Sequence, residues 1–91
     1  MDIERAIFPP DIIEKIKVKH QVDWWEAEEI FFNTDPSPLV LKSQGKYVIY
    51  GCTDNGRYLM VGFIYRRPKV AVVRTARDMT DKEKKLYKSK R

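Results

Sequence analysis

Two arginines, Arg74 and Arg77, stand where the last apolar run of the chain ends. A guanidinium group is planar and permanently charged, and its forked N–H donors match two oxygens of a phosphate. Arg66, Arg67 and Lys69 precede the same run, so a hairpin there would gather these cations along one rim. We therefore predict a site for a polyanion, with RNA as the best candidate. The alternative is a solvated face whose arginines pair with nearby carboxylates or lie over the last helix.

Tyrosine and histidine side chains add further candidates. Tyr65 ends a strand-like run beside Arg66, so its ring is placed to stack on a base, and Tyr87 is the second choice. Tyrosines interleaved with strands more often pack in a core, and that interpretation stays open. Histidine serves many enzymes as a general acid or base, which makes His20 a candidate, although a histidine at a helix end is more often a dipole partner.

The composition excludes several kinds of chemistry. One histidine and one cysteine leave no cluster for a zinc site, and we expect no metal or other cofactor. The lone Cys52 cannot form an intramolecular disulfide, which favours a reducing cytoplasm. No apolar run approaches the roughly 20 residues that span a bilayer, and no signal peptide opens the chain, so we expect no membrane association.

The charge is spread unevenly along the chain. Residues 1–65 contain seven Lys/Arg and ten Asp/Glu, a net charge of −3. Residues 66–91 contain eleven Lys/Arg and three Asp/Glu, a net charge of +8. A basic C-terminal face of this kind attracts phosphate or an acidic protein partner.

Periodicity and capping signals predict the elements that position these residues. PPDIIEKIKVKH and DWWEAEEIFF have helical spacing of apolar residues, and Asp23 with Glu26 has the form of a capping box. Four β-branched and aromatic runs then predict strands: LVLKS, KYVIYGC, RYLMVGFIY and KVAVVRT. Thr80 with Glu83 predicts the start of a final helix.

The fold class predicted is α+β, with residues 1–91 as a single domain. Two N-terminal helices pack on a three- to four-stranded antiparallel sheet, and a short helix closes the chain.

Three segments, taken with the order of the elements, resemble a known family. The segments are KHQVDWWEAEEIF, KYVIYGCTDNGRYLMVGF and TARDMTDKEKKLY, and the likeness runs from about residue 11 to residue 87. The chain resembles a divergent branch of the BrnT-type toxins, which are small RelE-like ribonucleases of bacterial type II toxin–antitoxin pairs.

The resemblance implies a RelE-like fold and metal-independent cleavage of RNA, with mRNA, free or on the ribosome, as substrate. It also implies a cognate antitoxin encoded alongside. In RelE-like enzymes, cations and tyrosines orient the RNA 2′-hydroxyl for attack on its own phosphate and stabilise the developing charge. The matching positions here are Lys46, Arg77 and Tyr87 for catalysis, with His20 as a further contributor, and Arg57 for RNA binding.

A function of a different class stays open. A non-catalytic module would bind RNA or an acidic protein through the same basic face and would need no general acid or base. The sequence also leaves the oligomeric state open, with a homodimer among the options.

Overall fold

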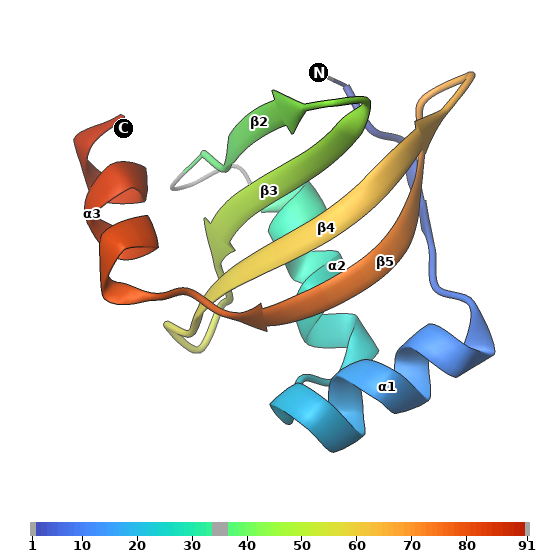
Figure 1. The fold of residues 1–91 in the computed structure, drawn as a ribbon, viewed down its shortest axis with the longest axis horizontal. Helices are drawn as coiled ribbons and strands as arrows, with labels where there is room; N and C mark the ends of the chain where they lie inside the picture. The colour runs from blue at the N-terminus through green and yellow to red at the C-terminus, as the bar shows by residue number, and fades with distance from the viewer. Residues whose placement is uncertain (1, 34–36, 91) are drawn as a thin grey trace.

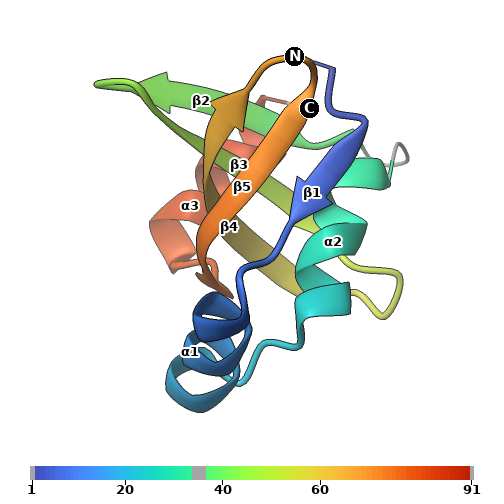
Figure 2. The same cartoon turned by 90° about the vertical axis from the view of Figure 1, so that its right-hand side faces the viewer.

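The computed structural model describes residues 2–33 and 37–90 of the chain. Five strands and three helices follow in the order β1 (Arg5–Ile7), α1 (Pro10–His20), α2 (Trp24–Phe32), β2 (Leu39–Ser43), β3 (Lys46–Cys52), β4 (Tyr58–Arg66), β5 (Val70–Asp78) and α3 (Asp81–Ser89). A twisted sheet runs through the molecule, with α1 and α2 on one side and α3 on the other (Figures 1 and 2). The α+β class and the three predicted helices are confirmed.

The sheet has the strand order β1-β5-β4-β3-β2. The four predicted strands form its antiparallel part, β2 to β5. The fifth strand, β1, pairs in parallel with β5, with Ala6 opposite Ala71, so the sheet is mixed. The prediction of three to four antiparallel strands was therefore incomplete. Three residues are too short to display a period of two, and nothing local marks a parallel partner more than 60 residues away.

The two faces of the sheet are covered unequally. On one face, α1 and α2 bury the main core, in which Ile16, Val61 and Val73 are fully buried. On the other face, α3 packs through Tyr87 against Tyr50 and Met60, in a smaller cluster. No helix of the described residues covers the rest of this second face, and we call it the open face (Figure 2).

A β-bulge interrupts the pairing of β4 with β5. Gly62 pairs with Thr75, whereas the next residue, Phe63, pairs with Val73, so Arg74 is the extra residue of the bulge. Because the bulge breaks the alternation of side chains, both Arg74 and Thr75 face the same side of the sheet. Val73 is buried in the main core, which places Arg74 and Thr75 on the open face.

Candidate functional site

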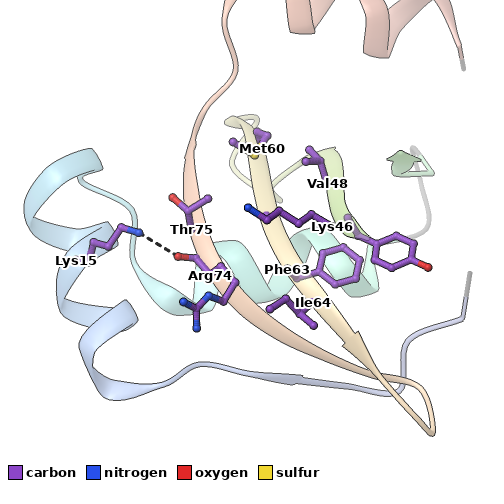
Figure 3. A pocket seen from close by; sticks show the side chains of 10 residues that line it. Lys15, Lys46, Val48, Met60, Phe63, Ile64, Arg74 and Thr75 are labelled. Carbon is purple, nitrogen blue, oxygen red and sulfur yellow. Dashed lines mark hydrogen bonds between the residues drawn. The ribbon is translucent and has the colours of Figure 1, made fainter. Parts of the chain in front are cut away.

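A pocket of about 420 Å³ lies on the open face, where β3, β4 and β5 run side by side (Figure 3). Apolar side chains form part of its wall, and three cations come to it from three different elements: Lys15 from α1, Lys46 from β3 and Arg74 from β5. We call these three residues the pocket cations.

The bulge and a glycine shape the floor of this pocket. Gly62 lines the pocket opposite Thr75, and an added Cβ would lie 3.0 Å from the Thr75 methyl group. Any side chain at position 62 would therefore press against Thr75. Figure 3 shows Lys46 reaching from β3 over β4, with Arg74 and Thr75 on the neighbouring strand.

Lys15 reaches the pocket from the edge of the sheet. β1 ends at Ile7 opposite Val72, and Lys15 Nζ donates a hydrogen bond to the carbonyl oxygen of Arg74, at 3.2 Å, just past the end of β1 (Figure 3). The sequence prediction missed Lys15. A signal was present, because Lys15 borders the apolar stripe of Ile12 and Ile16, and such a position lies at the rim of a packed helix.

The pocket carries uncompensated positive charge. Among residues 2–33 and 37–90, no acidic side chain lines it, and none of the three pocket cations forms an ion pair with a carboxylate. Cations that share a concave surface without a carboxylate attract an anionic ligand. Lys46 and Arg74, both predicted from the sequence, are thus brought together.

Arg77 lies on the same face but is held by a carboxylate. Its two terminal nitrogens donate to the two oxygens of Glu83, at 2.8 and 3.0 Å. Hydrogen bonds from Arg77 and from the Thr80 backbone lower the pKa of Glu83 from 4.5 to about 2. Burial and the neighbouring Glu83 raise the pKa of Tyr50, whose hydroxyl donates to the same carboxylate at 3.3 Å. Arg77 therefore ties the first turn of α3 to the sheet.

Arg57 is more completely engaged than Arg77. Nε and Nη2 donate to the two oxygens of Asp78, at 2.8 and 3.2 Å, which raises the pKa of Arg57 and lowers that of Asp78. The other bonds go to Glu26, at 3.0 Å, and to the carbonyl oxygens of His20 and Gln21, at 3.2 and 2.8 Å. A guanidinium has five N–H groups, and these five bonds use all of them.

The contacts of Arg57 explain the turn between α1 and α2. Gln21 has a φ of 54°, in the left-handed region that glycine adopts most readily. Arg57 binds the carbonyl oxygens of His20 and of Gln21 itself. It also binds Glu26 in the capping box of α2. We assign Arg57 to holding this junction against the end of the sheet rather than to binding RNA.

The cations of the β4–β5 hairpin lie outside the pocket. Lys69 Nζ is 3.3 Å from a carboxylate oxygen of Asp2 and 3.7 Å from one of Glu4. The hydroxyl of Tyr65 accepts a hydrogen bond from the Lys69 backbone, at 3.0 Å. Arg66 and Arg67 are exposed at the hairpin tip. The predicted grouping of the hairpin with Arg74 and Arg77 on one rim is not what the structure shows.

Two further candidates from the sequence also lie away from the pocket. Tyr87 is fully buried, with its ring edge-on to Tyr58 at 6.1 Å between centroids, so it belongs to the core beneath α3. His20 ends α1 and is half-buried, and its backbone carbonyl is bound by Arg57. Neither side chain lines the pocket.

Neither a cluster of metal ligands nor a membrane-spanning helix occurs in the described residues. Within residues 2–33 and 37–90, no three His, Cys, Asp or Glu side chains gather in a way that could hold a metal ion. None of the helices in these two ranges has both the length and the apolar character needed to cross a membrane.

Two helices on one face of the sheet, a third on the other and the order of the elements together make up a fold that a solved structure shares. A crystal structure of the Brucella abortus ribonuclease toxin, BrnT, matches it with a TM-score of 0.67, over 85% of this chain and 97% of that one. The two sequences are 15% identical, so the likeness concerns the fold. No family model matches the chain, and no curated protein sequence does. The fold implied by the sequence resemblance is confirmed.

Proposed function

We propose that the chain is the RNA-cleaving component of a toxin–antitoxin pair and that the pocket cations hold the RNA phosphates. The observation that carries the proposal is the convergence of Lys15, Lys46 and Arg74 on one pocket without a lining carboxylate. The structural neighbour, a ribonuclease toxin with the same fold, supports the choice of RNA. The proposal includes an antitoxin partner and action in the cytoplasm, on free mRNA or on the ribosome.

The chemistry proposed is attack of a ribose 2′-oxygen on the adjacent phosphorus. A bond forms between the 2′-oxygen and phosphorus, the bond from phosphorus to the 5′-oxygen breaks, and the products are a 2′,3′-cyclic phosphate and a 5′-hydroxyl. The 2′-hydroxyl proton passes to water. Arg74 keeps its proton and is suited to the charge on the phosphate oxygens, whereas a lysine ammonium can give a proton to the departing 5′-oxygen. We assign that second role to Lys46. No step requires a metal ion.

Arg77 has a secondary place in this proposal. It lies on the open face opposite Met60, two residue pairs along the strands from Thr75, but Glu83 holds its terminal nitrogens. A phosphate reaches Arg77 fully only by displacing Glu83. Tyr87, His20, Arg57 and the hairpin residues are not part of the proposed site.

One observation favours the alternative, a non-catalytic RNA-binding module. Among the described residues that line the pocket there is neither a carboxylate nor an imidazole, the groups that most often act as general bases. Phosphate binding alone needs only the cations.

Cleavage of a labelled RNA in a buffer with excess chelator separates these possibilities. The proposal predicts a 2′,3′-cyclic phosphate and a 5′-hydroxyl, and no cut at a linkage whose 2′-hydroxyl is replaced by hydrogen. Lys46→Ala should lower the cleavage rate by about a hundredfold or more while RNA affinity falls far less. Binding without cleavage by the wild type would favour the module. Absence of both binding and cleavage would reject the two functions together.

A further inference from the structure

We infer that the pocket takes one unpaired nucleotide, with its base on the apolar wall, and does not read which base it is. This inference rests on the proposed function, since it takes the pocket as an RNA site. It adds the substrate class: a single-stranded segment of any sequence.

The size and composition of the pocket support a single nucleotide. About 420 Å³ lies within the range of about 300–1,000 Å³ found for small-ligand sites. Lys46 starts on β3 and reaches over β4, Arg74 lies on β5, and β4 contributes Met60, Gly62 and Ile64. Phosphate oxygens therefore have cationic partners in the pocket, and the uncharged base has an apolar surface beside them.

The wall offers little that distinguishes one base from another. Val48 and Ile64 carry no hydrogen-bonding group, Met60 has only a weakly accepting sulfur, and Thr75 contributes one hydroxyl. Tyr47 also borders the pocket, but its ring stacks on Phe63, at 5.5 Å between centroids, and packs with the main core. Base identity is read through hydrogen bonds to base edges, whereas contact with the flat face of a base tolerates any sequence.

An unpaired strand is required because the apolar wall lies beside the cations and is contacted by the face of a base. In a duplex the faces of the bases are covered by their neighbours in the stack, and exposing one costs unstacking and unpairing. A single strand presents its bases without that cost. The apolar wall thus favours a single strand over a duplex, whereas the cations alone would bind any chain of phosphates.

The test measures binding by fluorescence anisotropy, with the full chain and labelled octanucleotides under chelator and at low temperature to limit cleavage. We expect A, U and C homopolymers and an alternating GU strand to bind within about threefold of each other. A hairpin duplex of equal charge should bind at least about tenfold more weakly, and so should an abasic octamer, which keeps the phosphates but lacks the bases.

Two matched variants locate the base contact. Ile64→Ser changes an exposed side chain of the wall and should weaken binding of all four strands by a similar factor, while abasic binding stays the same. Leu41→Ser changes a comparably exposed side chain on β2, outside the lining, and should leave every affinity unchanged.

The possible failures are distinguishable. If the abasic strand or the duplex binds as tightly as the homopolymers, or if one base is preferred more than about tenfold, the inference is overturned while the phosphate site stands. If no strand binds, or if Arg74→Ala leaves all binding unchanged, the proposed function itself fails.

Discussion

Two groups of cations in this molecule differ in what surrounds them. The strand-end arginines, Arg57 and Arg77, each lie against carboxylates, whereas the pocket cations have no carboxylate partner among the described residues. The first group uses its donors on carboxylates of the protein, whereas the second donates to none of the described carboxylates and so has charge available to a ligand. Positive charge alone therefore does not mark a binding site, and the carboxylates nearby decide which role an arginine takes.

The strand-end arginines also share a structural role. Arg57 binds Glu26 in the capping box of α2, and Arg77 binds Glu83 in the capping box of α3. In both cases one carboxylate closes a helix start and anchors it to the sheet. The negative charge also lies at the positive end of the helix dipole, which favours the same arrangement.

Removal of Arg57 should have the largest effect on stability. Arg57→Ala removes five hydrogen bonds and leaves Glu26, whose side chain is 13% exposed, without its cation. We expect the free energy of unfolding to fall by about 3 kcal/mol in urea titrations. Arg66→Ala, at the exposed hairpin tip, is the control and should cost less than about 0.5 kcal/mol. Equal effects of the two changes would contradict the assigned role of Arg57.

Glu83 should make stability depend on pH in the acid range. Because folding lowers the pKa of Glu83 from 4.5 to about 2, its pairing stabilises the fold above pH 4.5 and is lost as the pH falls towards 2. The loss amounts to at most about 3 kcal/mol. Glu83→Gln should remove that part of the acid dependence, as measured by urea midpoints between pH 7 and pH 2.

The same variant, Glu83→Gln, tests whether Glu83 keeps Arg77 from binding phosphate. Without its carboxylate partner, Arg77 becomes available to phosphate, so RNA affinity at pH 7 should rise in Glu83→Gln. The control is Asp81→Asn, which removes an acidic side chain from the same helical turn. Asp81 forms no ion pair with the described residues, so this change should alter neither the acid dependence of stability nor the RNA affinity. A fall in RNA affinity with Glu83→Gln would show that Glu83 positions Arg77 for the ligand instead.

The smallest of these effects concerns the start of α3. The Thr80 hydroxyl accepts a hydrogen bond from the Glu83 backbone, at 3.2 Å, so Thr80→Ala should cost about 1 kcal/mol of stability. RNA affinity should remain unchanged because Thr80 lies outside the pocket. Thermal unfolding together with anisotropy checks both statements, and a weakened affinity would place α3 in the site.

Local signals account for the part of the fold that the sequence predicted. The strand Lys46–Cys52 and the capping boxes at Asp23 and Thr80 depend on residues within one element, so period and spacing reveal them. Strand β1 and the bulge at Arg74 depend on pairing between distant segments. No single-sequence pattern encodes such pairing.

The candidate site was predicted in part for the same reason. Residue type and position near a strand end singled out Arg74, and family resemblance singled out Lys46. Both methods also selected Arg77, and resemblance selected Arg57. The acids that engage them are set by the fold: Glu26 and Asp78 lie 31 and 21 residues from Arg57. Lys15 joins the pocket through packing of α1 on β5, which is again a tertiary effect.

The central claim is that RNA is bound by the pocket cations and not by positive charge in general. The most direct test compares Arg74→Ala with Arg66→Ala, two changes of equal charge on exposed arginines, by anisotropy with a labelled single-stranded RNA. We predict that Arg74→Ala weakens binding about tenfold and lowers the salt dependence by about one phosphate contact, while Arg66→Ala changes affinity less than about twofold. Equal losses in the two variants would contradict the claim.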